Sequence, residues 1–113
     1  MNEKDQEIAM NVILSASDAK NYALEASKKA QEGDFEEAER LMSKSEECLN
    51  QAHHIQFQML QDEANGNGHE LCLLMVHSQD HLMNAITVVD LTRGNIELWK
   101  TIHGLKKGRI DHD

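Results

Sequence analysis

Hydrophobic and polar positions alternate with a helical period along most of this chain. Between residues 5 and 32, apolar or small residues recur in steps of three and four, and lysines and glutamates fall between them. The recurring positions are Ile8, Val12, Ala16, Ala19, Ala23, Ala26 and Ala30. This spacing predicts an amphipathic helix over 5–32 with a narrow alanine seam, which a neighbouring backbone can approach closely.

A second helical pattern covers 34–64. Gly33 is typical of a helix C-terminus, Asp34 of an N-cap, and Glu37 stands where a capping box has its second residue. The apolar stripe that follows comprises Phe35, Ala38, Leu41, Met42, Cys48, Leu49, Ala52, Ile55, Met59 and Leu60. Asn65-Gly66-Asn67-Gly68 then predicts a loop, because Asn and Gly tolerate positive φ and neither favours a helix interior.

The third pattern, over 69–103, is apolar on two opposite faces. At about 100° per residue, one face carries Leu71, Leu74, Met75, Ser78, Leu82, Ala85 and Val89. The opposite face carries Asp80 near its middle, among Leu73, Val76, Met83, Thr87 and Leu91. A three-helix bundle of this size cannot bury both faces of one helix, so the second face predicts self-association around a symmetry axis. After His103, Gly104 and the basic residues Lys106, Lys107 and Arg109 predict a helix end and a frayed tail.

Composition agrees with an all-α fold and a single domain over 1–113. Only 4% of the residues are aromatic and there is no proline, while residues that favour helices dominate. The net charge of -9 disfavours nucleic acid and anionic membranes as partners, and the polar groups of the third helix disfavour insertion in a bilayer. Cys48 and Cys72 lack a CxxC spacing, and no signal peptide pattern precedes them, which indicates buried thiols in a reducing cytoplasm.

The segment His77-Ser78-Gln79-Asp80-His81 places two imidazoles and a carboxylate within little more than one helical turn. Copies of Asp80 brought together at an axis would repel one another, so they would have to become protonated, pair with cations or bind a metal ion. Oxygen ligands favour a hard ion such as magnesium over zinc. The simpler alternative is that Asp80 faces solvent or pairs with a local Lys or Arg.

His77 allows three interpretations. It can be a structural or exposed histidine, or a nucleophile for a phosphoryl group that is oriented by a neighbouring side chain: Gln79, Asn84 or His81. A zinc hydrolase helix of the H-x-x-E-H type is a weaker match, because Asp80 is a methylene shorter than Glu and few residues follow to supply a third ligand. On the second helix, His53 and His54 diverge by about 100° and cannot clamp one metal together. They are structural, or one faces a neighbouring subunit's His77.

Leu73-Leu74-Met75-Val76-His77-Ser78-Gln79-Asp80-His81-Leu82-Met83 closely resembles the active-site helix of a known family. This family is the IIA component (EIIA) of the lactose/cellobiose (chitobiose) class of the sugar phosphotransferase system (PTS). Gln51-Ala52-His53-His54 and the Gly33-Asp34-Phe35 turn also resemble its second helix. Where the family commonly has Ala after the active histidine, this chain has Ser78, on the side of the helix that faces the core.

The resemblance implies a cytoplasmic homotrimer of three-helix protomers, with nine helices in all. It implies that His77 accepts a phosphoryl group from phospho-HPr and passes it to a cysteine of the cognate IIB component (EIIB), with Gln79 and His81 in supporting roles. Asp80 matches the aspartate whose three copies hold a divalent metal ion, usually assigned as magnesium, on the trimer axis. The sugar stays open among lactose, cellobiose, chitobiose and lichenan-derived sugars, because the membrane component selects it.

A non-catalytic trimeric adaptor, in which the His and Asp side chains form a structural polar layer, is the alternative function. The two functions predict different environments for His77. An adaptor would hide this side chain, whereas a phosphocarrier must leave a ring nitrogen open to its partners.

Overall fold

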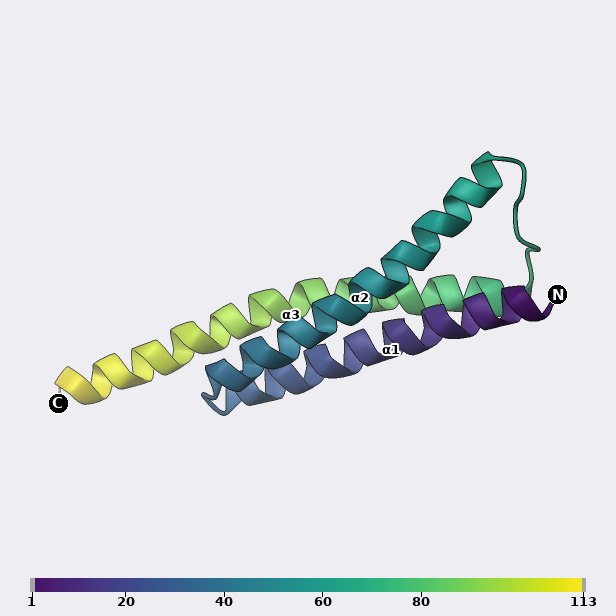
Figure 1. Cartoon of the computed structure of the whole chain (residues 1–113). Coiled ribbons are helices and arrows are strands. Elements are labelled where there is room, and N and C mark those ends of the chain that lie inside the picture. The colour runs from purple at the N-terminus through teal and green to yellow at the C-terminus, as the bar shows by residue number, and fades with distance from the viewer. Residues whose placement is uncertain (1, 113) are drawn as a thin grey trace.

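The computed structural model describes residues 2–112, and side chains over 2–108. Three helices make up the described chain: α1 (Glu3–Gln31), α2 (Phe35–Ala64) and α3 (Leu73–His112). They form an elongated bundle of 68 × 21 × 19 Å (Figure 1). The all-α class and the three helices are therefore confirmed, and α1 and α2 begin and end within two residues of the predicted bounds. Assembly into a homotrimer stays a prediction.

The first helix is the central packing element, because it contacts α2 and α3 more extensively than these two contact each other. Its seam consists of small, fully buried side chains: Ala9, Val12, Ala16, Ala19, Ala23, Ala26 and Ala30. Ile8, predicted as the first member of the seam, is only half-buried, and Ala9 takes its place. Alanines bring neighbouring backbones close, and the hydroxyl of the buried Ser45 on α2 donates to the carbonyl of Ala19 at 2.6 Å.

The turn between α1 and α2 is fixed from three sides. Gly33 has φ +85°, which side-chain-bearing residues rarely adopt, and the Asp34 carboxylate accepts from the Glu37 N–H at 3.2 Å as the N-cap. Only this half of the predicted capping box forms, because the Glu37 side chain binds Arg40 instead. From α3, His103 Nε2 lies 2.9 Å from the Gln31 carbonyl oxygen, so the imidazole caps the end of α1.

The two halves of α2 have different environments. Its buried residues, from Ala38 to Ala52, all belong to the first two thirds of the helix. Beyond Ala52 the helix diverges from α1 and α3 (Figure 1). Leu60, predicted in the buried stripe, is therefore exposed, as is Phe57. The amphipathic pattern of α2 continues to its end, but its last part is only partly covered: Ile55 still packs against the core and Met59 is half-buried.

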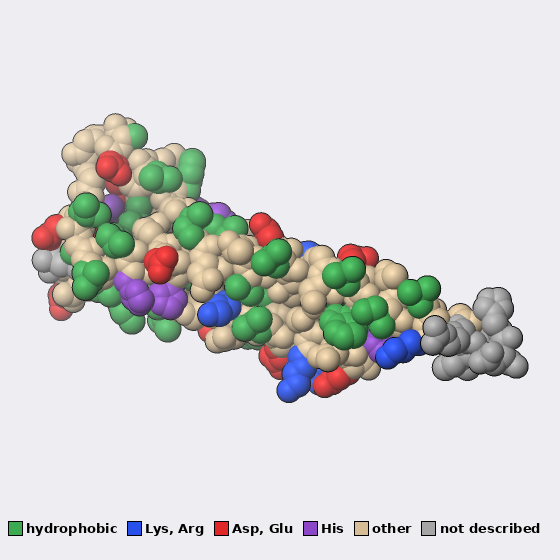
Figure 2. Space-filling model, turned by 180° about the vertical axis from the view of Figure 1, so that it is seen from behind, with side chains coloured by type: hydrophobic (Ala, Val, Ile, Leu, Met, Phe, Trp, Pro, Cys, Tyr) green, Lys and Arg blue, Asp and Glu red, His purple; other side chains and the backbone are tan. Residues whose placement is uncertain are grey.

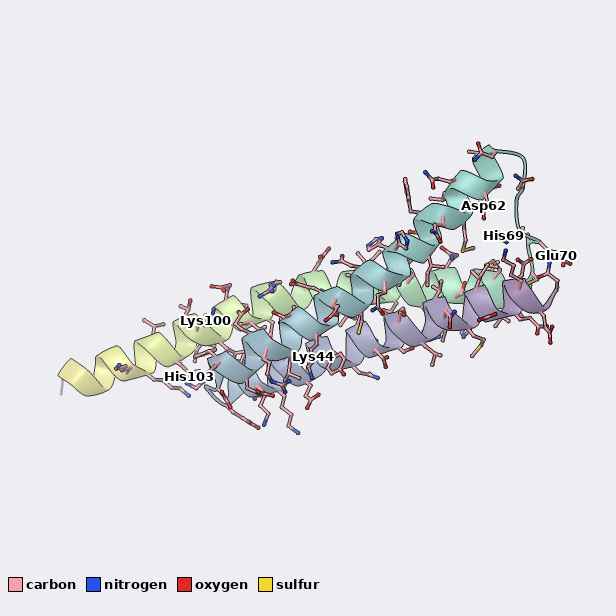
Figure 3. The ribbon with its side chains drawn as sticks, in the orientation of Figure 1. Lys44, Asp62, His69, Glu70, Lys100 and His103 are labelled. Atoms are coloured by element: carbon pink, nitrogen blue, oxygen red, sulfur yellow. The ribbon has the colours of Figure 1, made fainter. Side chains whose placement is uncertain are left out.

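The loop between α2 and α3 is longer than predicted, because α3 starts at Leu73 and not near His69. His69 lies between two carboxylates: Nδ1 is 2.7 Å from Asp5 Oδ1 on α1, and Nε2 is 3.0 Å from Asp62 Oδ2 on α2 (Figure 3). A carboxylate can only accept, so both contacts are hydrogen bonds when the ring carries two protons. This bridge holds residue 69 outside a helix and places Leu71, predicted on the core face, in solvent.

The bridge at His69 predicts a pH-dependent contribution to stability. Hydrogen bonds with Asp5 and then Asp62 raise the pKa of His69 above its unfolded value of about 6.5. When a group has a higher pKa in the folded protein than in the unfolded chain, its protonation stabilises the fold. This stabilisation is fully present below the unfolded pKa and is lost as the pH rises through the folded pKa. We expect the unfolding free energy of wild type to exceed that of His69→Gln at about pH 6, with a smaller difference at about pH 9 in urea titrations. A difference that does not change with pH would contradict the bridge.

The third helix buries one face, as predicted. The buried residues on α3 are Met75, Ser78, Leu82, Ala85, Val89, Thr92 and Ile96. The predicted helix end near His103 is wrong, because α3 continues through Gly104 and Gly108 to His112. A glycine inside a helix costs only about 1 kcal/mol relative to alanine, and this chain has no proline that would force an end.

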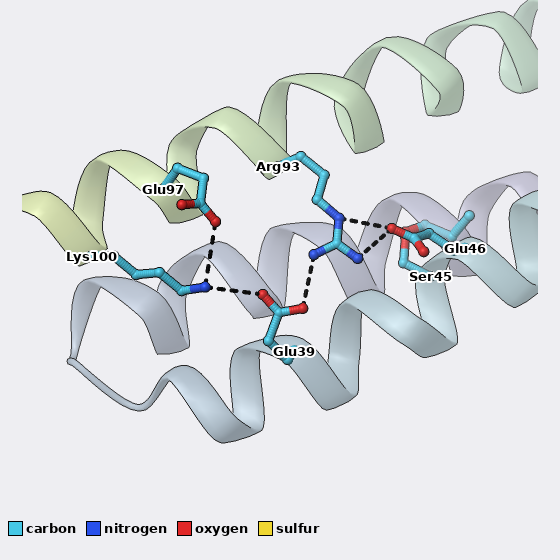
Figure 4. Close-up of polar contacts among 7 residues, drawn as sticks. Glu39, Ser45, Glu46, Arg93, Glu97 and Lys100 are labelled. Carbon is cyan, nitrogen blue, oxygen red and sulfur yellow. Dashed lines mark hydrogen bonds and ion pairs between the residues drawn. The ribbon is translucent and has the colours of Figure 1, made fainter.

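The contact between α2 and α3 is largely polar where the helices approach the α1–α2 turn. The Arg93 guanidinium on α3 donates to Glu46 Oε1 at 2.9 Å and to Glu39 Oε2 at 2.8 Å (Figure 4). These hydrogen bonds lower the pKa of Glu39 and raise that of Arg93. Lys100 extends the network, with Nζ 3.5 Å from Glu39 Oε1. Because these side chains are more than a third exposed, the network fixes the position of α3 along α2 more than it adds stability.

Candidate functional site

The second face of α3 is apolar and exposed, as the sequence predicts. Its members are not covered by α1 or α2: Leu73, Val76, Met83, Thr87 and Leu91 are all exposed. Figure 2 shows hydrophobic side chains at intervals along the whole molecule on one of its faces. A long row of exposed, large apolar side chains on one helix indicates a surface that another protein chain covers.

His77 and His81 form a pair next to this face. They are one helical turn apart on α3, with their Nε2 atoms 3.1 Å apart and their ring centroids 4.5 Å apart in an edge-to-face arrangement. At this distance one Nε2 donates a proton and the other accepts it. His77 is exposed and His81 is half-buried. The pair can therefore hold a proton next to an accessible imidazole, which suits a nucleophile that acquires a negatively charged group.

The structure separates Gln79 from this pair. Gln56 on α2 donates through Nε2 to Gln79 Oε1 at 2.8 Å, so the Gln79 amide faces the diverging part of α2. Of the candidates for an orienting group, His81 is the one in contact with His77. Gln56 is the residue that sequence reasoning missed, because a glutamine on a polar stretch of helix carries no signal of its partner.

Ser78 lies on the core side of α3, as predicted. It is fully buried, and its hydroxyl donates to the Met75 carbonyl at 2.7 Å within the same helix. The hydroxyl therefore has a partner where the family commonly has a methyl group. A satisfied serine in this position leaves the packing beneath His77 undisturbed.

Asp80 is exposed on the second face of α3. It lines an open hollow together with His81, Met83, Asn84 and Thr87. Within the described part of a single chain, no three His, Cys, Asp or Glu side chains come together in a way that could hold a metal ion. A metal site that uses Asp80 would therefore need ligands of another kind, such as the Asn84 or Thr87 oxygens, water or a second copy of the chain.

The remaining candidate residues lie outside this site. His53 and His54 are both exposed on α2, and His54 lines an open hollow with Glu46 and Glu47 among others. Cys48 and Cys72 are half-buried and not fully buried as predicted. Burial raises the pKa of the Cys48 thiol, with smaller effects of Asp18 and Glu47, so this thiol is a poor nucleophile at neutral pH. None of the helices over residues 2–112 has a stretch long and apolar enough to span a bilayer.

Comparison with known proteins supports the family resemblance along nearly the whole chain. Residues 7–100 match the family model described as PTS system, lactose/cellobiose-specific IIA subunit. The lichenan-specific phosphotransferase enzyme IIA component of Bacillus subtilis (strain 168) is 44% identical over 102 residues, which cover 90% of this chain and 93% of that protein. The lactose-specific EIIA component of Streptococcus mutans is 38% identical over 93 residues, 82% of this chain and 89% of that protein.

Solved structures agree with this. The crystal structure of the PTS cellobiose-specific enzyme IIA from Bacillus anthracis superposes with a TM-score of 0.88 at 39% identity, over 92% of this chain and 95% of that one. The solution structure of the IIA(Chitobiose)–HPr complex from Escherichia coli contains a chain that superposes with a TM-score of 0.76 at 31% identity, over 91% of this chain and 99% of that one. The three-helix fold, the His77 segment and these matches agree: the chain belongs to the lactose/cellobiose-specific IIA family of the phosphotransferase system.

Proposed function

We propose that this protein carries a phosphoryl group on His77, which it receives from phospho-HPr and passes to a cysteine of EIIB. A IIA component is a phosphotransferase component of sugar uptake, and the relay serves the phosphorylation of a β-linked disaccharide in the cytoplasm. The observation that carries the assignment to His77 is its exposure beside His81 on the family's motif helix. An adaptor with a structural histidine layer would hide this ring, so the exposure favours the phosphocarrier.

The chemistry requires positioning and charge stabilisation and no deep substrate pocket. In the first step the P–N bond of phospho-HPr breaks as a P–N bond to His77 forms, and in the second step the phosphoryl group leaves His77 for the EIIB thiolate. Such transfers pass through a loose transition state whose charge is spread over the phosphoryl oxygens. His81, with Nε2 3.1 Å from His77 Nε2, can provide a proton and positive charge beside those oxygens. His81 is thus the supporting residue that the geometry favours, ahead of Gln79.

HPr is the partner for which a related structure gives direct support. The Escherichia coli relative was solved in complex with HPr, and this chain covers almost all of that relative's length at 31% identity. The relatives act on different sugars, with lichenan, oligo-β-mannoside and lactose among them. The sugar therefore stays open among lactose, cellobiose, chitobiose and lichenan-derived sugars, with lichenan or cellobiose favoured by the 44% identity to the lichenan component.

The Asp80 residues of three subunits are the proposed ligands of a divalent metal ion, magnesium, on a trimer axis. The residues fit this assignment: Asp80 is an exposed carboxylate on an apolar face, and Asn84 and Thr87 add oxygen atoms to the same hollow. When bound, the ion supplies positive charge that compensates the three carboxylates. Asp80 itself holds the ion and keeps the polar layer in register, and it takes no part in phosphoryl transfer.

Replacing Asp80 by leucine should abolish metal binding without dissolving the trimer. Leucine suits the apolar face around it, and removing like charges from an axis removes their repulsion. The expected result is a trimer in sedimentation analysis whose bound magnesium, measured by elemental analysis of the dialysed protein, falls from one ion per three chains to none. Asp90→Leu is the control and should keep the ion, because it makes the same change at an exposed aspartate of α3 that does not line this hollow. A monomeric or unfolded Asp80→Leu protein would contradict the axial position.

The proposed function is tested by reconstituting the relay. The full chain is incubated with phosphoenolpyruvate, enzyme I and HPr, and its intact mass is measured. We expect a gain of one phosphoryl group per chain that is labile in acid and stable in base, as phosphohistidine is. Adding the cognate EIIB should discharge it. If the mass does not change although HPr is phosphorylated, the protein is not a phosphocarrier and the adaptor function takes its place.

A further inference from the structure

The two imidazoles on α3 have the spacing of neighbouring ligands around one metal ion. His77 Nε2 and His81 Nε2 are 3.1 Å apart. Two ring nitrogens that each bind an ion at about 2.0–2.1 Å are this far apart when the angle at the ion is about 100°. This angle lies between the right angle of octahedral or square-planar centres and the wider angle of tetrahedral ones. The two nitrogens are therefore already placed to bind one ion together.

The other histidines with described side chains are not arranged in this way. His69 has both ring nitrogens on carboxylates, and His103 has Nε2 on a backbone carbonyl oxygen. The histidines at 53–54 are neighbours in sequence, so their side chains diverge around α2. Within residues 2–108, the pair on α3 is thus the one in which two ring nitrogens approach to hydrogen-bond distance.

We propose that His77 and His81 together chelate a divalent ion of the nickel, copper and zinc kind, and that this ion blocks His77 while it is bound. Imidazole nitrogens are the ligands that these ions favour. The exposure of His77 gives the ion access, and the exposed Asp80 carboxylate beside His81 in sequence attracts cations to the same place. No third His, Cys, Asp or Glu of the described chain completes the centre, so water fills the remaining positions and the ion can leave again.

This site differs from the proposed magnesium site in its ligands. Magnesium takes oxygen ligands, so it competes poorly for two imidazole nitrogens. The chelate also needs only one chain, because both rings belong to α3 and lie one helical turn apart. Magnesium at Asp80 and a zinc ion on the imidazole pair are therefore separable by experiment.

The bound ion would remove the lone pair on which phosphorylation depends, a consequence that rests on the proposed function. A neutral imidazole has one protonated nitrogen and one nitrogen with a free lone pair. When Nε2 of His77 binds the ion, the ring proton is on Nδ1, so neither nitrogen is free to attack phosphorus. The ring that donates Nε2–H to its neighbour in the metal-free pair moves that proton to its own Nδ1, and no proton is gained or lost.

The site is tested by titrating the full chain, labelled with ¹⁵N-histidine, with zinc chloride in a buffer that contains magnesium. We expect the Nε2 resonances of His77 and His81 to shift together, with the change complete at one zinc ion per chain. In His81→Ala the response of His77 should need about 100-fold more zinc, since a single imidazole lacks the advantage of a second linked ligand. His54→Ala is the matched control and should leave the response unchanged. If His54 and His77 of wild type respond at the same zinc concentration, binding is adventitious at single exposed histidines and the chelate is wrong.

Asp80→Leu distinguishes the chelate from the proposed magnesium site. This variant keeps both imidazoles, so His77 and His81 should still respond to zinc together. A smaller affinity is expected, because the neighbouring carboxylate no longer attracts the ion. If the joint response is lost, the ion belongs to a site built on Asp80 and the chelate is wrong.

The block is tested with purified phospho-HPr as the donor, without enzyme I, so that zinc acts on fewer components. The rate at which the chain gains a phosphoryl group should fall to the fraction of chains that are free of zinc, and EDTA should restore it. At the same zinc concentration His81→Ala should keep most of its own zinc-free rate. An undiminished wild-type rate with both histidines bound to zinc would overturn the block. A chain that is not phosphorylated even without zinc would overturn the proposed function, while the titration would still decide the metal site.

Discussion

His77→Ala is expected to lose all acid-labile phosphorylation in the reconstituted relay while keeping the fold of the wild type. The loss should be complete because no other group in contact with His77 can replace it: its neighbour His81 is half-buried with Nε2 turned toward His77. The fold should survive because His77 is exposed and its ring contributes nothing to the core. Intact mass and thermal unfolding of the same sample measure both results.

His54→Ala is the matched control, since it removes an exposed histidine from α2. It should be phosphorylated to one group per chain, as wild type is. His81→Ala should have an intermediate effect: we expect phosphorylation to slow by about 100-fold or more, the usual contribution of a positioned proton donor. A His77→Ala protein that still accepts a phosphoryl group would move the site to another histidine.

Ala23→Leu is expected to cause a large loss of stability, because it places a bulky side chain in the seam of α1. The side chain of Ala23 has no solvent-accessible surface and lies midway along a row of buried alanines. Three additional carbon atoms there must push α2 or α3 away from α1, because side chains this small let the helices approach closely. Overpacking of this kind costs about 3 kcal/mol of unfolding free energy, measurable as a lower urea midpoint.

Glu25→Leu controls for the change to leucine on the same helix. Glu25 is exposed, so this substitution should change the unfolding free energy by less than about 0.5 kcal/mol. A similar loss in both variants would mean that α1 tolerates leucine equally on its two sides. That result would be incompatible with a seam of close helix contacts.

The hydrophobic period predicted the helices well, because a helix and its buried face are determined by residues within a few turns of each other in sequence. The alanine steps of α1 and the core face of α3 around Leu82 depend on nothing but a period of 3.6 residues, and both are buried as expected. The turn at Gly33 could be predicted equally well, because a backbone position with positive φ strongly favours glycine.

Contacts between residues distant in sequence explain most of what the local pattern could not predict. The start of α3 depends on His69 meeting Asp5 and Asp62, and nothing in the local pattern around residue 69 reveals those carboxylates. Gln79 faces Gln56, which no period predicts. The predicted helix end at Gly104 is wrong for a different, local reason: a glycine weakens a helix but does not end it, and α3 continues to His112.

The candidate site can be predicted from the residue types and the family resemblance together, and it stays a prediction. Two histidines one turn apart were visible in the sequence, and the structure adds that their Nε2 atoms meet. The exposed second face of α3 followed from the argument that a small bundle cannot bury both sides of a helix, and the exposure of Val76, Met83 and Leu91 agrees with it.

The divergence of α2 after Ala52 gives the protein two levels of rigidity along one helix. Its first part is locked into the core, so those residues can open only when the whole bundle unfolds. The last part, which carries Phe57 and Leu60 in solvent, is held mainly by polar contacts, those of Gln56 with Gln79 and of Asp62 with His69, so it can shift at a lower cost than the core. A carrier that must fit two proteins in turn gains from this: a surface that can adapt and the proposed nucleophile, His77, belong to the same chain but to different helices.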